Sequence, residues 1–129
     1  MKKIVSTMNA PQAIGPYSQA VISGDLIFLS GQIPLDPETG RLWGSDIAAQ
    51  TERVMKNIQA VIEAAGGSLA DIVKTTVYLV DLNNFNEMNR VYERYFQENP
   101  PARATIQAAS LPAGAMIEIE AVARMGGNG

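Results

Sequence analysis

Residues 116–123 read Met116-Ile117-Glu118-Ile119-Glu120-Ala121-Val122-Ala123 and alternate between two kinds of side chain. Successive side chains of a strand point to opposite faces, so the isoleucines and alanines share one face and the two glutamates share the other. The pattern predicts a strand with one face on a helix-covered core. The other face mixes methionine, valine and carboxylates, which suits a subunit interface with polar pockets better than free solvent.

The rest of the chain predicts an α+β domain built around this strand. Gly66-Gly67 ends a helix of clear amphipathic period, and Pro100-Pro101 ends a second one that begins at a capping box formed by Asn84 and Glu87. Strands are expected at 18–22, 26–30, 72–80, 103–109 and 116–124, and the first helix at 46–65. The order is ββαβαββ, with an extra short strand at 4–5, and both helices are expected on one face of one sheet.

Composition and charge narrow the classes of function. The 129 residues predict one domain, 1–129, with a glycine-rich C-terminal tail that frays. A net charge of −3 and scattered cationic residues disfavour nucleic acid as a partner. No apolar run approaches the roughly 20 residues that span a bilayer, and the start of the chain is too polar for a signal peptide. A cytoplasmic protein that does not bind membranes is therefore expected.

The chain contains no histidine and no cysteine. Disulfides, thiol catalysis and thiolate metal sites are excluded, and the commonest general base and metal ligand is absent. Acid–base chemistry must therefore use carboxylates, tyrosines, hydroxyls, lysines or bound water. The glycines have neither Walker nor dinucleotide-binding spacing.

Arg103, Glu118 and Glu120 are the charged residues that stand out. Arg103 follows two prolines, and its guanidinium suits either a clamp on a substrate carboxylate or an ordinary salt bridge. The glutamates share a strand face, so one of them orients water while the other is structural, or both are surface residues with Arg124 as a partner.

Tyr17 and Ser30 flank the predicted hairpin, next to Gly15-Pro16 and Gly31. Both side chains can donate hydrogen bonds to a ligand at a point where a glycine lets the backbone approach closely. The alternative interpretation makes Tyr17 a packed anchor of its loop and Ser30 a cap at the end of a strand.

Four motifs together resemble the RidA (YjgF) family of reactive-intermediate deaminases. They read Ala13-Ile14-Gly15-Pro16-Tyr17-Ser18-Gln19-Ala20, Ser30-Gly31-Gln32-Ile33-Pro34, Pro101-Ala102-Arg103-Ala104-Thr105 and Ile117-Glu118-Ile119-Glu120-Ala121, and the likeness extends over essentially the whole chain. The resemblance implies a chorismate-mutase-like fold and a homotrimer with sites between subunits. It also implies hydrolysis of 2-imino and 2-enamino acids, such as 2-aminoacrylate and 2-iminobutanoate, to 2-oxo acids and ammonia, without a cofactor or metal, as repair of metabolite damage.

The same resemblance gives roles to individual residues. Arg103 would bind the substrate carboxylate and Glu118 would orient or activate the attacking water, while Glu120 would be structural. Tyr17, Ser30, Gly31, Asn89 and Thr105 would complete the substrate pocket. Several relatives have cysteine where this chain has Thr105, so a thiol-dependent reaction is excluded here. A non-enzymatic, small-acid-binding or regulatory role is the alternative, and a ribonuclease role is disfavoured by the acidic pI and the missing histidine.

Overall fold

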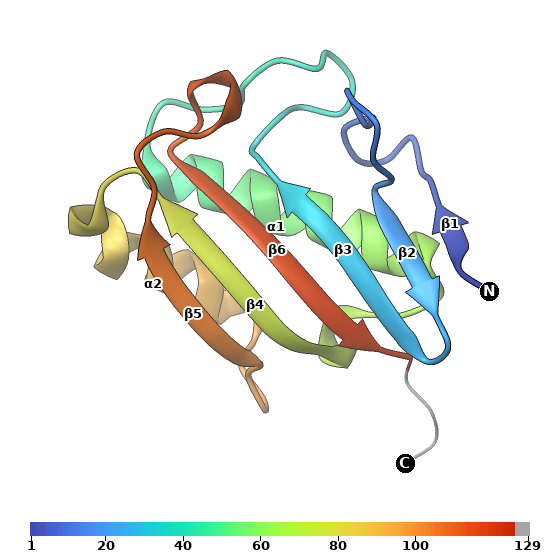
Figure 1. Ribbon diagram of the computed structural model, residues 1–129. Helices are drawn as coiled ribbons and strands as arrows, with labels where there is room; N and C mark the ends of the chain where they lie inside the picture. Colours follow the sequence, from blue (N-terminus) through green and yellow to red (C-terminus); the bar gives the residue numbers. More distant parts are fainter. Residues whose placement is uncertain (126–129) are drawn as a thin grey trace.

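Two helices cover one face of a single sheet, and the other face is open (Figure 1). The computed structural model describes residues 1–125, so the tail that was expected to fray, residues 126–129, lies outside the described residues. The strands and helices are β1 Lys3–Val5, β2 Ala20–Ser23, β3 Leu26–Gln32, α1 Ile47–Ala64, β4 Ile72–Leu79, α2 Phe85–Tyr95, β5 Ala102–Gln107 and β6 Ile117–Arg124. The predicted α+β class, the element order and the extra N-terminal strand are confirmed.

The strands lie in the order β1-β2-β3-β6-β4-β5. The predicted hairpin of β2 and β3 is antiparallel, and β6 inserts between β3 and β4, antiparallel to both. β5 pairs with β4 in parallel, which requires a crossover connection, and α2 supplies it behind the sheet. The two strands that follow α2 are therefore not neighbours, although they are consecutive in the sequence.

The alternating strand β6 behaves as its pattern predicts. Ile117, Ile119, Ala121 and Ala123 are buried in the core, whereas Glu118 and Val122 are partly exposed on the open face. Phe28 pairs with Val122 from β3 and leaves 45% of its surface exposed on that face. The open face thus carries apolar side chains beside carboxylates.

The two helices begin and end differently from one another. Asp46 caps α1 by accepting a hydrogen bond from the Ala49 N–H at 2.8 Å, and Gly66 ends it with a φ of +93°. The predicted capping box of Asn84 and Glu87 is wrong, because a 3₁₀ turn runs straight into α2 and the Asn84 side chain caps nothing. Local composition alone does not reveal that the preceding turn is already helical.

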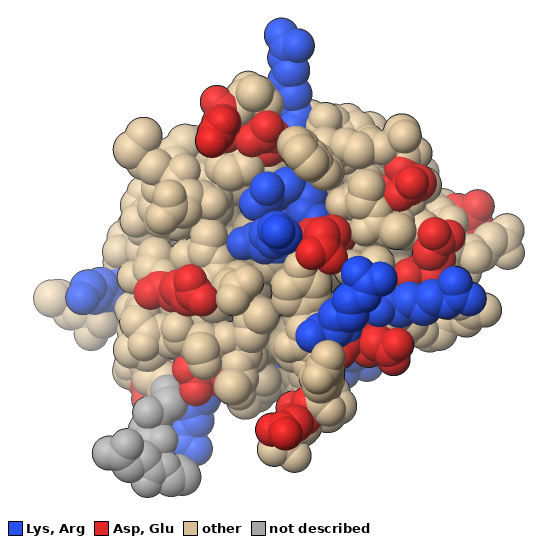
Figure 2. Space-filling view, turned by 180° about the vertical axis from the view of Figure 1, so that it is seen from behind, with Lys and Arg blue, Asp and Glu red and all other residues tan. Residues whose placement is uncertain are grey.

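The outer surface of the helices is polar. Figure 2 shows Lys and Arg side chains near the centre of this side of the molecule, with Asp and Glu side chains interspersed among them. Such a surface of mixed sign is typical of a solvated face. Among the helices of residues 1–125, none is both long and apolar enough to cross a membrane.

Candidate functional site

A cavity of about 370 Å³ opens where β3 ends and β6 begins. It brings together four of the predicted site residues, Tyr17, Ser30, Gly31 and Glu118, and we call it the glutamate cavity. Its remaining walls are apolar and come from Ile14, Ile33 and Pro112. These three residues were not predicted as part of a site, because their only signal was an apolar side chain or a proline in a turn-rich segment.

An irregularity in strand pairing shapes the floor of the cavity. Leu29 pairs with Ala121 and Gln32 pairs with Ile119, so β3 contains one residue more than β6 between these pairs. Such a bulge changes the direction of side chains locally, which is why two consecutive residues, Ser30 and Gly31, both line the cavity. The Ser30 hydroxyl donates to the Ser18 carbonyl oxygen at 2.6 Å, so Ser30 also ties the cavity floor on β3 to the segment just before β2.

Gly31 makes room for the Glu118 carboxylate. A Cβ atom at position 31 would lie 2.0 Å from Glu118 Oε2 and 2.9 Å from its Cδ, well inside van der Waals contact. The carboxylate therefore occupies the space that any other residue at position 31 would fill. Glycine at position 31 lets the carboxylate lie this close to the backbone; it does not serve a left-handed backbone, since its φ lies outside that region.

The surroundings of Glu118 raise the pKa of its carboxyl group. Burial is the larger cause, because it penalises the charged form, and the nearby charge of Glu120 adds to it. A carboxyl group with a raised pKa is suited to accept and return a proton near neutral pH.

Glu120 is more exposed and accepts a hydrogen bond from the Tyr78 hydroxyl, which raises the pKa of Tyr78. Arg124, the partner of the glutamates in the alternative interpretation, instead pairs with Asp25, with its Nε 2.9 Å from Asp25 Oδ2. The two strand glutamates thus sit in different environments.

Buried amide side chains hold the loops around the glutamate cavity. Gln19 is 4% exposed; its Oε1 accepts from the Thr7 N–H at 2.7 Å, and its Nε2 donates to the Pro11 carbonyl oxygen at 2.7 Å. Asn57 donates to the Leu35 carbonyl oxygen at 3.0 Å and so holds the loop that follows Ile33.

Tyr17 is half exposed and accepts a hydrogen bond from the Ile14 N–H at 3.3 Å, so it anchors its own loop as well as lining the cavity.

Arg103 lies elsewhere, on the helix-covered side of the sheet. Its Cζ is 4.8 Å from the centre of the Tyr92 ring and 5.5 Å from the centre of the Phe85 ring, both on α2. These distances are within the range of cation–π attraction. Arg103 forms no salt bridge with any residue in the range 1–125, where the ion pairs are Arg94 with Glu52 and Arg124 with Asp25. Its charge is stacked on aromatic rings but not neutralised.

The other two predicted residues belong with Arg103. Asn89 is four residues after Phe85 and three before Tyr92 on α2, so it shares their helix face. Thr105 is two residues beyond Arg103 on β5, and its buried hydroxyl has no hydrogen-bond partner among the described residues. We call Arg103, Phe85, Asn89, Tyr92 and Thr105 the arginine cluster.

The arginine cluster and the glutamate cavity lie on opposite faces of the sheet. Arg103 pairs with Thr75 and Glu118 pairs with Tyr78, so the two pairs are three residues apart along β4. This is about 10 Å along the strand, and two strand spacings of about 4.8 Å are added across the sheet. Within one chain, therefore, Arg103 and Glu118 do not face a common ligand.

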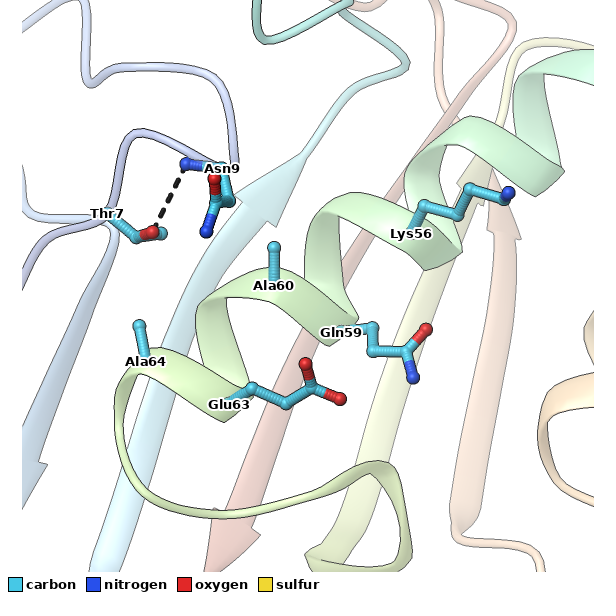
Figure 3. Close-up of a pocket in the computed structure, with 7 residues that line it drawn as sticks. All are labelled: Thr7, Asn9, Lys56, Gln59, Ala60, Glu63 and Ala64. Carbon is cyan, nitrogen blue, oxygen red and sulfur yellow. Dashed lines mark hydrogen bonds between the residues drawn. The ribbon is translucent and has the colours of Figure 1, made fainter.

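A larger cavity, of about 460 Å³, lies between the N-terminal loop and α1. Figure 3 shows Ala60 and Ala64 facing Thr7 and Asn9, while Lys56, Gln59 and Glu63 spread along the helix. None of the predicted site residues lines it, and its charged side chains are exposed. Among residues 1–125, no three Asp or Glu side chains are grouped in a way that would hold a metal ion.

The whole chain has close relatives among known proteins. It is 48% identical to human 2-iminobutanoate/2-iminopropanoate deaminase over 98% of this chain and 92% of that protein, and 52% identical to a RutC family protein of Pyrococcus horikoshii over 95% and 98%. The crystal structure of E. coli TdcF with bound serine matches with a TM-score of 0.91 and 44% identity, over 95% of this chain and 98% of that chain. A family model described as Endoribonuclease L-PSP matches residues 7–125. The chain belongs to this family, the YjgF/RidA family that its motifs resemble.

Proposed function

We propose that this protein hydrolyses 2-imino and 2-enamino acids, such as 2-iminobutanoate and 2-aminoacrylate, to 2-oxo acids and ammonia. The observation that carries the proposal is the Glu118 carboxylate, held against Gly31 in a small cavity with apolar walls. The deaminase name of the human relative supports the same reaction. The predicted cytoplasmic location stays a prediction.

The proposed chemistry needs one proton-handling group and an anion-binding group. Ionised Glu118 takes a proton from water as the water oxygen bonds to the electrophilic imine carbon. The C=N π electrons and this proton go to nitrogen, which gives a tetrahedral carbinolamine. The hydroxyl proton of the carbinolamine then passes through Glu118 to nitrogen, the C–N bond breaks, and ammonia leaves as the carbonyl of the 2-oxo acid forms. Arg103 holds the substrate carboxylate through paired N–H donors, and this positioning is a large part of the rate enhancement.

We further propose that each site forms between two copies of the chain in a homotrimer. One copy would supply the arginine cluster and its neighbour the glutamate cavity, because the two groups lie on opposite faces of one sheet. The exposed apolar residues of the open face, such as Phe28, support contact with another copy. This arrangement agrees with a guanidinium that has no ionic partner within its own described chain.

The reaction is tested by coupling the protein to a threonine dehydratase and measuring 2-oxobutanoate formation. We expect wild type to accelerate its formation, and Arg103→Ala to abolish the acceleration. The matched control is Arg124→Ala, since Arg124 is an exposed arginine paired with Asp25 outside both groups. No acceleration by wild type, or full activity of Arg103→Ala, would contradict the proposal.

The shared site is tested by mixing two inactive variants. If Arg103 and Glu118 of one site come from different copies, trimers assembled from equal amounts of Arg103→Ala and Glu118→Gln chains regain about one quarter of the sites by random assembly. If both residues come from one chain, no activity returns. Light scattering that shows a stable monomer would refute the intersubunit site directly.

The alternative function is binding of small acids without turnover. The TdcF structure holds serine, which supports binding of a small carboxylate by a relative. Affinity for 2-oxobutanoate without catalysis would favour this role. The ribonuclease activity in the family description is not extended to this chain, because a net charge of −3 disfavours RNA binding. RNA cleavage that persists through repurification and is lost in Arg103→Ala would reverse that conclusion.

A further inference from the structure

The Arg103 guanidinium is presented by an aromatic surface. The Arg103 Cζ lies over the Tyr92 ring at 4.8 Å and over the Phe85 ring at 5.5 Å from the centroids, so two rings of α2 hold the guanidinium by cation–π attraction. The N–H donors point outward from its edges, and these edges form the paired hydrogen bonds to a carboxylate. A stacked arginine therefore keeps its donors available while its orientation is restricted.

Tyr92 is itself held in place. It is 6% exposed, its hydroxyl lies 2.7 Å from the Thr75 hydroxyl, and its ring packs against Phe96 with 4.8 Å between centroids. Thr75 is 1% exposed and is the residue of β4 that pairs directly with Arg103. The strand neighbour of the arginine thus fixes the ring on which the arginine stacks.

We infer that Tyr92, fixed by its hydrogen bond to Thr75, is a positioning residue that orients Arg103 toward the substrate carboxylate. The inference rests on the proposed function, since it assumes that Arg103 binds that carboxylate. Without the ring, the long arginine side chain must be ordered when the ligand binds. Loss of the cation–π contact and of this preorganisation weakens carboxylate binding on the order of tenfold.

The test measures the dissociation constant of 2-oxobutanoate by calorimetry, with kcat and KM measured alongside. Tyr92→Leu should weaken binding about tenfold and raise KM, with a smaller change in kcat. Tyr92→Phe and Thr75→Val each remove the same hydrogen bond but keep the fold, so each should weaken binding roughly twofold to threefold and the double variant no further. Tyr95→Phe is the control, because Tyr95 on the same helix bonds Glu52 instead.

The outcomes separate the inference from the function on which it rests. Unchanged affinity in Tyr92→Phe and Thr75→Val, or additive losses in their double variant, would overturn the role of Tyr92 alone. A change in thermal unfolding without a change in affinity or KM would also overturn it, since a purely structural residue behaves that way. Binding without turnover would overturn only the proposed reaction, whereas no binding of 2-oxobutanoate to wild type would overturn both.

Discussion

The contact between Gly31 and Glu118 leads to a quantitative prediction for Gly31→Ala. The new Cβ would lie 2.0 Å from Glu118 Oε2, whereas an ordinary contact begins near 3.4 Å, so the carboxylate must move by about 1.4 Å. A misplacement of about 1 Å in a catalytic group can cost on the order of 100-fold in rate. We therefore expect kcat to fall about 100-fold.

The same substitution should leave the fold intact. The backbone of Gly31 lies outside the left-handed region, so alanine adds no strain there. Replacing glycine by alanine at a compatible position stabilises by about 0.4–1 kcal/mol through the unfolded chain. We expect the free energy of unfolding, measured by urea denaturation, to change by less than about 1 kcal/mol.

The dehydratase-coupled assay checks this prediction against a matched control and a second background. Gly15→Ala adds a Cβ beside the cavity-lining Ile14, at an ordinary 3.5 Å from the Tyr17 ring, so its kcat should stay near that of wild type. In a Glu118→Gln background, Gly31→Ala should lower kcat little further, because both substitutions disable the same carboxylate. A folded Gly31→Ala protein with wild-type kcat would refute the reasoning, as would a further 100-fold loss in that background.

Three further predictions concern the charges and the unpaired hydroxyl. Burial, the larger cause of the raised Glu118 pKa, remains in Glu120→Gln, which keeps an acceptor for Tyr78 but removes the smaller cause, the charge of Glu120. The acidic limb of kcat/KM against pH should therefore move to lower pH, and an unmoved limb would contradict this. Glu118→Gln should lower kcat about 10²–10⁴-fold. Glu118→Gln should also raise the melting temperature at neutral pH. The pKa of Glu118 in the folded protein is raised above its ordinary value of 4.5, so the contribution of this carboxyl group to stability is lost as pH rises through that folded pKa, and glutamine carries no charge to bury. A melting temperature equal to or below that of wild type at pH 7 would argue against this. Thr105→Val should raise the melting temperature, since the buried hydroxyl has no partner among the described residues, while weakening 2-oxobutanoate binding; a lower melting temperature in thermal unfolding would count against the first claim.

The elements were predictable because their signals are local. The alternation in residues 117–123 correctly predicts which side chains of β6 enter the core, and Gly66 marks the end of α1. The capping box at Asn84 failed because the turn before it, Leu82–Asn84, is already helical. A local sequence pattern predicts the helices and strands, but it does not show whether the turn that leads into a helix is itself helical.

The relative positions of the candidate site residues could not be predicted from local sequence patterns. The sequence predicts Arg103 and Glu118 as site residues but does not predict that they lie on opposite faces. That placement depends on the parallel register of β5 with β4 and on the insertion of β6. The buried amides of Gln19 and Asn57 escaped notice because polar residues are usually exposed. Their positions follow from which loops pass over them, and those loops are set by long-range pairing.

The central place of β6 in the sheet has a consequence for the synthesis of the protein. Before residues 117–124 leave the ribosome, β3 and β4 have no common neighbour, and the nascent chain carries two incomplete sheets with unpaired edges. Pairing between segments so distant in sequence is slow, and such edges are prone to aggregate. Because Glu118 lies on that same strand, the carboxylate that we propose handles the proton is placed only when β6 completes the sheet.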